Sequence, residues 1–353
     1  MTKIMFIAPL RVLDWPEADQ AAWKAALEDD PLAPGGFGGA AFWRASTVKV
    51  TEAGYGLWLA WLQRRGELDN PSSFVVRVTP DLVREFLADM RWAGLSDYSA
   101  ATRLCGLAAA LGAMAPQFDA RFITRGAGRV RAGASPARDM ASRAIPLDEL
   151  LRLGCALLER AEEQPDQVAR ALLFRDGLLI KLLVHRPLRI SNMASIEIGR
   201  SLQNTRSGYR LHFEAEEMKN KCPYTAVFPP DLVVTLERYL DEFRPVLLER
   251  LRHCDSSRAL WIGKDGQALK VDSVTAILKR RTLAEFGRAS GPHILRHSVA
   301  TTIAQNSPQN ISEVPTILGH KNLQTSERHY IHANAIAAGG QLHEAIAARR
   351  KRI

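Results

Sequence analysis

Apolar side chains in the first third of the chain recur at the three- and four-residue spacing that places them on one face of an α-helix. A second helix is predicted after Thr79, with Pro80 at its first position, where a missing N–H costs no hydrogen bond. A third begins near Ser99. Together they predict a small all-helical domain at residues 43–124. The first of these three helices is predicted within TVKVTEAGYGLWLAWLQRRG, which places near one face Val50, Tyr55, Leu57, Trp58 and Trp61.

The helical pattern returns at Ile145 and is interrupted once. Residues 209–213 and 224–228 have the composition of two short strands, and EAEEMKNKCP connects them as a hairpin. After PPDLVVTLERYLDEFRPVLLERL the chain is again mostly helical. The predicted fold is therefore mainly α with a small β-sheet. Its second, mixed domain covers residues 144–335.

Three segments lie outside these two domains. Residues 1–42, with Pro16, Pro31 and the run GGFGGAAF, are predicted to be irregular. Residues 125–143 contain three glycines, one proline and five arginines, which predicts a basic linker whose arginines contact phosphates. Residues 336–353 form a C-terminal tail that ends in a basic helix.

Composition narrows the class of protein. A chain of 353 residues is too long for one ordinary core, which agrees with two domains. No apolar run approaches the roughly 18 residues of a membrane span, and the start has no secretory pattern. The four cysteines form no CxxC pair, which predicts buried free thiols in a cytoplasmic protein with no membrane partner.

The positive charge lies in the second part of the chain. Residues 1–125 contain 13 Lys and Arg against 14 Asp and Glu, so the remainder carries +10 where the whole chain carries +9. Such an excess favours a polyanionic partner, with nucleic acid first.

Two motifs of the second domain supply cationic side chains. Arg189, in RPLRISNM, follows an apolar helix and either pairs with a carboxylate or serves a site. Lys219 and Lys221, in EEMKNK, lie at the predicted hairpin connection. A lysine there is ordinarily solvated, but over a substrate its ammonium can act as a general acid.

Two later motifs contain histidines. In GPHILRHSVATTIA, His293 and Arg296 are three apart and project from one helix face. His297 is four from His293, as in a zinc motif, but a third ligand is missing and an arginine between them would repel a dication. We therefore predict no metal. In LGHKNLQTSERHYIH, His320 precedes Tyr330 by ten residues, and a lone tyrosine is most often a surface residue.

The order Arg … Lys … HxxR … LGH … Tyr resembles the tyrosine recombinase, or phage integrase, family. The resemblance spans roughly residues 144–335, and the helical residues 43–124 resemble the core-binding domain of that family. The matching residues are Arg189, Lys219, His293, Arg296, His320 and Tyr330.

The chain departs from the family pattern at two places. Asn192 stands where the family often has Glu or Asp three residues after the first arginine. The spacing from His320 to Tyr330 is ten, where many members have nine, and a spacing of nine would select His329. A histidine is a poor substitute for a tyrosine, so Tyr330 remains the predicted nucleophile.

The resemblance implies a site-specific DNA recombinase that forms a 3′-phosphotyrosine intermediate without ATP, metal or other cofactor. Tyr330 would attack the phosphate, with His293 as its base. Arg189 and Arg296 would hold the phosphate, and His320 would hydrogen-bond one of its oxygens. The leaving 5′ oxygen would receive its proton from Lys219, with Lys221 as the alternative.

The family also implies partners. We expect the two domains to close as a C-shaped clamp on double-stranded DNA with inverted-repeat core sites, and four protomers to meet on DNA, coupled through residues 336–353. The enzyme would act on the nucleoid in the bacterial cytoplasm, to integrate, excise or resolve a mobile element; a need for accessory DNA-bending proteins stays open. Two alternatives are a type IB topoisomerase-like enzyme and a catalytically silent DNA-binding protein on the same scaffold.

Overall fold

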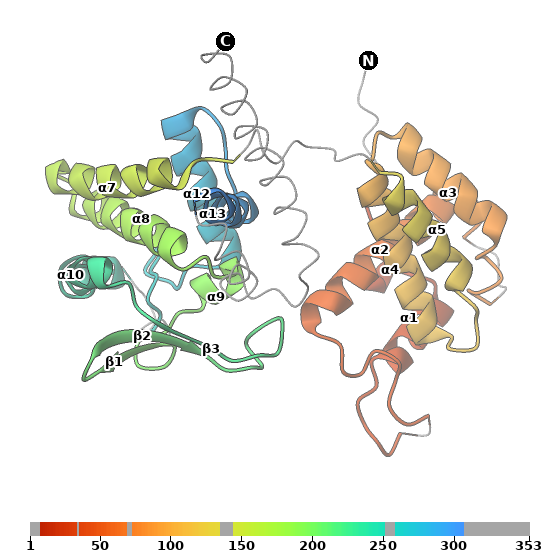
Figure 1. The fold of residues 1–353 in the computed structure, drawn as a ribbon. Helices are drawn as coiled ribbons and strands as arrows, with labels where there is room; N and C mark the ends of the chain where they lie inside the picture. Colours follow the sequence, from red (N-terminus) through yellow and green to blue (C-terminus); the bar gives the residue numbers. More distant parts are fainter. Residues whose placement is uncertain (1–7, 34, 69–72, 135–143, 251–257, 307–353) are drawn as a thin grey trace, which may run out of the picture. The chain divides into compact units, whose positions relative to one another are not determined.

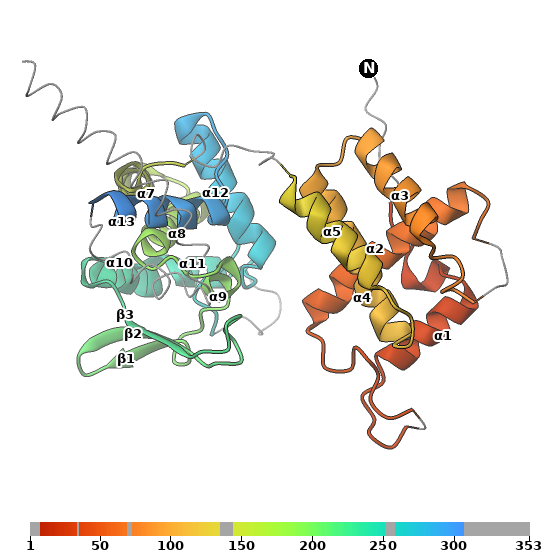
Figure 2. The ribbon, with the colours of Figure 1, turned by 45° about the vertical axis from the view of Figure 1, so that its right-hand side comes forward.

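The computed structural model describes residues 8–33, 35–68, 73–134, 144–250 and 258–306. The chain divides into two compact units, Met1–Arg138 and Asp139–Ile353, and each is described by itself. Helices dominate both units, and the second contains a small antiparallel sheet (Figures 1 and 2). The predicted fold class is confirmed. No helix in the described ranges is both long and apolar enough to span a bilayer.

The first unit is built around helix α4 (Asp97–Met114). Helices α1 (Glu17–Ala26), α2 (Ala45–Arg64), α3 (Pro80–Trp92) and α5 (Arg121–Ala132) all pack against α4 (Figure 1). A helix that touches four others is apolar on most of its surface, which explains the run LAAALGAM near its end.

Local sequence signals account for the helices that were predicted. Thr79 caps α3, because its hydroxyl accepts a hydrogen bond from the Leu82 amide at 3.2 Å and Pro80 follows. On α2 the aromatic residues Tyr55, Trp58 and Trp61 are buried as expected, but Val50 is 55% exposed. Val50 is exposed because it lies before residues 54–62, the stretch of α2 that is buried on all sides.

The prediction that residues 1–42 are irregular is wrong for α1, which has a buried anchor. Asp19 accepts hydrogen bonds from the Tyr55 hydroxyl at 2.7 Å and from the Arg77 guanidinium at 2.6 Å, and all three side chains are buried. A buried carboxylate needs such partners to offset its lost hydration. Trp23 fills the space beside this anchor, 6.2 Å from Trp15 between ring centroids.

The predicted linker at residues 125–143 is also wrong in its first half. Helix α5 continues through Ala132, and it buries Ile123 and Ala127 in the core of the first unit. Tertiary packing on α4 therefore overrides the loop signal of Gly126 and Gly128. The remaining linker residues, 135–143, lie outside the described part of the chain.

In the second unit, helix α8 (Gln167–His185) is the central element, and α7 (Leu147–Glu163) crosses it. The two helices touch through glycines: a Cβ on Gly177 would lie 2.8 Å from the carbonyl oxygen of Gly154. No side chain fits at that distance. The crossing therefore needs glycine at Gly177.

The sheet of the second unit has three strands in the order β1, β2, β3. Strands β2 (Gly208–Phe213) and β3 (Tyr224–Val227) pair antiparallel, with Phe213 opposite Tyr224, so the predicted hairpin is confirmed. Strand β1 (Leu202–Thr205) was not predicted, because its residues LQNT carry no apolar alternation. Its position comes from pairing with β2.

Five short helical segments and two longer helices, α12 and α13, complete the described part of the second unit. In chain order they are α9 (Ile190–Ala194), the 3₁₀ helix η2 (Pro230–Leu232), α10 (Val233–Arg238), the π-helix η3 (Tyr239–Phe243), α11 (Arg244–Leu248), α12 (Val271–Phe286) and α13 (Pro292–Asn306). Within its described residues, the first unit has one 3₁₀ turn, η1 (Val12–Asp14).

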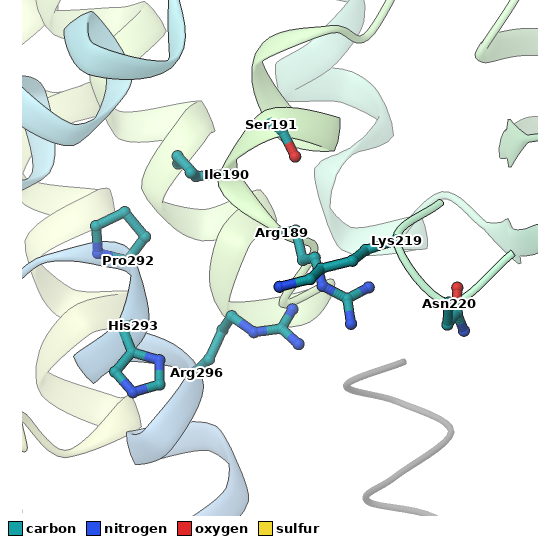
Figure 3. Close-up of a pocket in the computed structure, with 8 residues that line it drawn as sticks. All are labelled: Arg189, Ile190, Ser191, Lys219, Asn220, Pro292, His293 and Arg296. Carbon is teal, nitrogen blue, oxygen red and sulfur yellow. The ribbon is translucent and has the colours of Figure 1, made fainter. Parts of the chain in front are cut away.

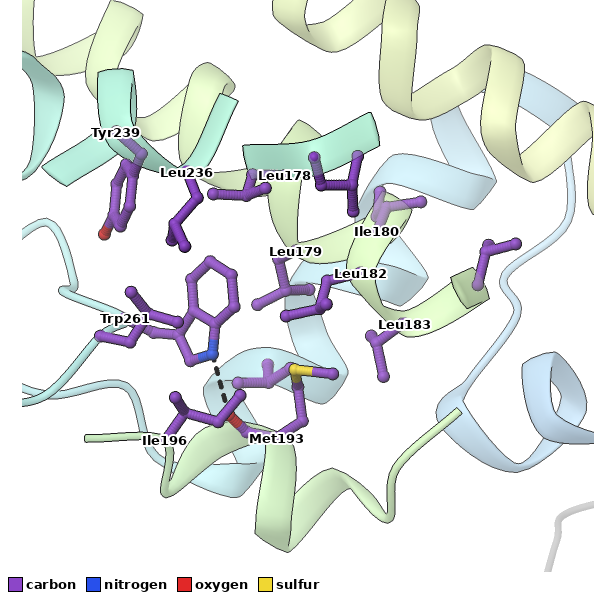
Figure 4. Close-up of a cluster of buried hydrophobic side chains, with 14 of the residues drawn as sticks. Leu178, Leu179, Ile180, Leu182, Leu183, Met193, Ile196, Leu236, Tyr239 and Trp261 are labelled. Atoms are coloured by element: carbon purple, nitrogen blue, oxygen red, sulfur yellow. Dashed lines mark hydrogen bonds between the residues drawn. The ribbon is translucent and has the colours of Figure 1, made fainter. Parts of the chain in front are cut away.

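The core of the second unit fixes the short helix α9. Trp261 is fully buried, and its indole N–H donates a hydrogen bond of 2.8 Å to the carbonyl of Met193 on α9 (Figure 4). Met193 is itself buried against α8, whose Leu179, Leu182 and Leu183 lie in the same cluster. A five-residue helix is unstable alone, so this packing determines where α9 and the residues before it lie.

The cysteine prediction holds only in part. Cys105, Cys155 and Cys222 are free thiols, as expected, but none is fully buried and Cys222 is exposed. Cys254 lies outside the described residues.

Candidate active site

Arg189 lies at the start of α9, in the turn that follows α8. It is the N-cap residue of α9 and has extended backbone angles, so its side chain leaves the helix axis at the first turn. Pro187, two residues earlier, prevents α8 from continuing. Because the Trp261 bond holds α9, the Arg189 backbone is fixed by the core of the second unit.

His293 and Arg296 lie on the first turns of α13, as their spacing predicted. The His293 side chain is exposed, whereas Arg296 is half-buried. Arg296 donates a hydrogen bond from Nη1 to the main-chain carbonyl of Pro187. Helix α13 is thereby joined to the same turn that leads to Arg189.

Lys219 lies in the connection between β2 and β3. The preceding residue, Met218, is buried in the core, and the Met218 carbonyl accepts a hydrogen bond of 3.0 Å from the Lys221 amide. Lys219 is therefore exposed at the corner of a tight turn, and the residue before it, Met218, is anchored in the core. Lys221 has a left-handed backbone conformation, with φ of 54°.

Four of the six predicted site residues meet in one pocket of ≈ 560 Å³. Figure 3 shows Lys219, Arg189 and Arg296 reaching toward the same part of it, with His293 beside Arg296 on α13. The size suits a small charged group with part of its attached molecule. The residues that line the pocket are Arg189, Ile190, Ser191, Lys219, Asn220, Pro292, His293 and Arg296.

The electrostatics of this pocket favour an anion. Burial lowers the pKa of the Arg189 guanidinium. Burial, and then the positive charge of Arg189, lower the pKa of Arg296 to about 10, although Tyr224 acts in the opposite sense. Both arginines are still charged at neutral pH. Two guanidinium groups that repel each other in a partly desolvated pocket are stabilised by an anion placed between them.

Arg186 and Lys221, the alternatives to Arg189 and Lys219, lie outside the pocket lining. Arg186 donates from Nε and Nη2 to the Val227 carbonyl at 3.1 and 2.8 Å, and from Nη1 to the His185 carbonyl at 2.9 Å. It holds the end of β3 against the end of α8. Neither Arg186 nor Lys221 is among the residues that line the pocket, so the geometry favours Arg189 and Lys219.

His320 and Tyr330 lie outside the described residues, as does the whole tail at 336–353. The pocket geometry therefore concerns four of the six predicted site residues, and the roles of all six stay predictions.

Sequence reasoning missed the residues that support the Lys219 turn. Asn192 is buried and donates a hydrogen bond of 3.2 Å from Nδ2 to the Glu217 carbonyl. The Glu217 carboxylate in turn forms an ion pair with Arg200. Asn192 and Glu217 are 25 residues apart, so no local pattern connects them.

Among the described residues, no three His, Cys, Asp or Glu side chains are grouped in a way that would hold a metal ion. The side chain of His297 is not among those described. The metal-free mechanism remains a prediction.

Comparison with known proteins places the chain in a family. The model of the phage integrase family matches residues 156–336, more than half of the chain. The chain belongs to the phage integrase family. It is a tyrosine site-specific recombinase, and the matched residues include the positions of His320 and Tyr330.

Its similarity to individual recombinases is modest but extends over both units. Tyrosine recombinase XerC of Mycobacterium bovis (strain BCG / Pasteur 1173P2) is 27% identical over 268 residues, which cover 76% of this chain and 83% of that protein. XerC of Actinobacillus succinogenes is 26% identical over 260 residues, covering 71% and 76%.

Solved structures show the same fold. The XerH site-specific recombinase bound to palindromic difH substrate, in a post-cleavage complex, has a TM-score of 0.57 at 18% identity and covers 85% of this chain and 79% of that one. The pre-cleavage complex of XerH with difH has a TM-score of 0.54 at 19% identity.

Proposed function

We propose that this recombinase cuts and rejoins DNA strands at a specific duplex site through a covalent 3′-phosphotyrosine intermediate on Tyr330. The observation that carries the proposal is the convergence of Arg189, Arg296, Lys219 and His293 on one pocket. The DNA-bound state of the XerH structures, which share its fold, supports a duplex as the substrate.

The two arginines would stabilise the transition state of phosphoryl transfer. Negative charge in that state is spread over the equatorial phosphate oxygens. Arg189 and Arg296 come from separate elements, α9 and α13, so they can approach two oxygens from different directions. The planar guanidinium suits this because it donates two parallel hydrogen bonds. Fixed positive charge in this position supplies what a metal ion supplies in other nucleases.

Proton transfers would be divided between the two ends of the scissile bond. The Tyr330 hydroxyl, with an ordinary pKa near ~10, loses its proton to His293 as its oxygen bonds to phosphorus. The bond from phosphorus to the 5′ oxygen breaks, and that oxygen takes a proton from the Lys219 ammonium. Attack of a 5′-hydroxyl from another strand reverses these steps and completes the exchange.

Both units would contact DNA, and four protomers would assemble on two duplexes. The charge of +7 over residues 139–353 supports a large phosphate contact area for the second unit. The exposed arginines of α5 give the first unit a basic face. The reaction would need neither nucleotide nor metal, and its biological outcome would be integration, excision or resolution of a mobile element.

The test is to trap the covalent intermediate. The protein is incubated, in excess EDTA, with DNA fragments from its own genetic neighbourhood, and denatured protein–DNA adducts are recovered and sequenced. We expect an adduct on the 3′-phosphate end of the cut strand, with a free 5′-hydroxyl on the other fragment, formed by wild type and by Tyr209→Phe but not by Tyr330→Phe, which should still bind DNA. An adduct that survives in Tyr330→Phe, or that requires zinc, would contradict the proposal.

A further inference from the structure

The turn that carries Lys219 is closed by three hydrogen bonds among its own residues. The Glu217 and Met218 amides donate to the Glu214 and Ala215 carbonyls at 3.1 and 3.2 Å, which closes the turn on itself. The Glu214 amide donates to the Glu217 carboxylate at 2.9 Å. These bonds shape the turn, but they do not fix it relative to the pocket.

Two contacts of Glu217 attach the turn to the rest of the second unit. Its carboxylate forms an ion pair with Arg200, which is also paired with Glu197 at 2.7 Å in the segment between α9 and β1. Its carbonyl accepts the hydrogen bond from Asn192, on α9. Glu217 therefore connects the Lys219 turn both to the segment before β1 and to the helix whose N-cap is Arg189.

The Asn192 contact depends on an amide at this position. An asparagine side chain has an N–H₂ group that donates to a carbonyl, whereas an ionised carboxylate only accepts. Aspartate at position 192 would place two oxygen acceptors against the Glu217 carbonyl, in a buried site where an unpaired charge is costly. The residue that departs from the family pattern thus fits its own partner in this chain.

We propose that Glu217, held by Arg200 and Asn192, is a positioning residue that keeps the Lys219 ammonium against the phosphate pocket for protonation of the leaving 5′ oxygen. This inference rests on the proposed function. Glu217 itself touches no substrate. Its role is to restrict the long, flexible lysine side chain, which otherwise spends most of its time in solvent.

A change of leaving group distinguishes a defect in proton delivery from a general loss of structure. Replacement of the bridging 5′ oxygen by sulfur gives a thiolate leaving group whose thiol has a pKa near ~8.5, far below the pKa of the 5′ alcohol, so its departure needs no proton donor. A variant that impairs only proton delivery is therefore rescued by sulfur. A variant that impairs phosphate binding or folding is not.

The experiment uses the full-length protein and a duplex oligonucleotide with the cleavage site recovered by covalent trapping, in oxygen and sulfur versions. We expect Glu217→Gln and Asn192→Asp to cleave the oxygen substrate about tenfold or more slowly, as partial versions of Lys219→Ala. On the sulfur substrate both should lie within about threefold of wild type. Arg189→Ala should fail on both substrates. Glu242→Gln, which removes a carboxylate from a different arginine pair, should match wild type on both.

The outcomes separate the inference from the function it rests on. Equal losses on the two substrates would overturn the positioning role, and so would full activity of Glu217→Gln on oxygen. If Lys219→Ala is not rescued by sulfur while wild type is active, Lys219 is not the acid and the inference falls with it. If wild type forms no adduct with either substrate, the proposed function itself fails.

Discussion

The guanidinium of Arg296 donates a hydrogen bond to the main-chain carbonyl of Pro187, two residues before Arg189. One bond thus joins the helix that carries His293 and Arg296 to the turn that carries Arg189. The two arginines are far apart in the sequence and close enough in space for the charge of Arg189 to lower the pKa of Arg296. This shared framework makes the pocket a unit whose parts can be tested separately.

Replacement of Arg189 by lysine should abolish most of the chemistry without loss of DNA binding. An ammonium cannot form the two parallel hydrogen bonds of a guanidinium, so we expect cleavage to fall about 100-fold or more. Arg186→Lys is the matched control, because Arg186 bonds to main-chain carbonyls and does not line the pocket. Single-turnover cleavage and a binding isotherm measure the two effects. Full activity of Arg189→Lys would show that the wrong arginine was chosen.

A bound oxyanion should stabilise the second unit through Arg296. Burial lowers the pKa of Arg296 to about 10 in the folded protein, so the unfolded chain binds more protons between pH 10 and the ordinary pKa of arginine. The charge therefore disfavours folding at every pH below 10, and this penalty is lost only as pH rises from 10 toward the ordinary pKa of arginine. An anion that offsets the penalty should act equally at pH 7 and pH 9.

Thermal unfolding in sulfate measures this effect. For a dissociation constant of about 5 mM, sulfate at about 50 mM would add roughly 1.4 kcal/mol to the free energy of unfolding. That corresponds to a rise in Tm of about 3 °C or more. Because sulfate also stabilises proteins without binding a site, the comparison is with Arg296→Met in the same salt. An equal rise in Tm for the variant would mean that the pocket does not bind the anion.

The basic face of α5 should contribute to DNA binding by the first unit. Arg125 and Arg129 are four residues apart, so they share one face of the helix, and both are exposed. If about 8 phosphates are neutralised overall, the logarithm of affinity should fall with the logarithm of salt at a slope near roughly −7. Arg125→Gln and Arg129→Gln should each make the slope shallower by about 1. Arg84→Gln, on α3 and paired with Asp81, is the control that should leave the slope unchanged.

Residues 336–353 are expected to couple protomers on DNA. They lie outside the described ranges, and in their sequence Gly339 and Gly340 precede a helix-like run with Leu342 and Ile346 near one face. An apolar stripe on a terminal helix tends to be buried on a neighbour. Truncation after Ala338 should leave binding to a single site nearly intact and impair synapsis in a two-site recombination assay. Recombination at the wild-type level would show that another segment couples the protomers.

The parts of the site that the sequence predicted are those with a local signal. The spacing of His293 and Arg296 and the position of Lys219 between two strands could be seen without a structure. Their meeting in one pocket was predicted through the family resemblance and not through the pattern. Helix α5 was missed because Gly126 and Gly128 favour a loop locally, while burial of Ile123 on α4 decides the outcome.

The support of the Lys219 turn could not be predicted from sequence. Asn192 and Glu217 gain their roles from a contact between α9 and the hairpin connection, and neither residue type is unusual in its own segment. Arg200, before β1, reads as an ordinary surface arginine until its pairing with Glu217 is known. Such contacts depend on how the elements pack, which single-sequence patterns do not encode.

The crossing of α7 and α8 should be the most sensitive backbone contact of the second unit. A Cβ on Gly177 would lie 2.8 Å from the Gly154 carbonyl oxygen and 3.0 Å from the Leu158 side chain, so Gly177→Ala must push the helices apart. We expect a loss of about 1–3 kcal/mol in the free energy of unfolding. Since α8 leads directly to Arg189, cleavage should also slow.

Gly112→Ala is the matched control: this exposed glycine lies within α4, and apart from the adjacent backbone of α4 itself no atom lies within 4 Å of its added Cβ. Alanine there should stabilise the first unit by roughly 0.5–1 kcal/mol. Chemical denaturation of both variants decides the point, and an unchanged midpoint for Gly177→Ala would mean that the helix crossing is less tight than the structure describes.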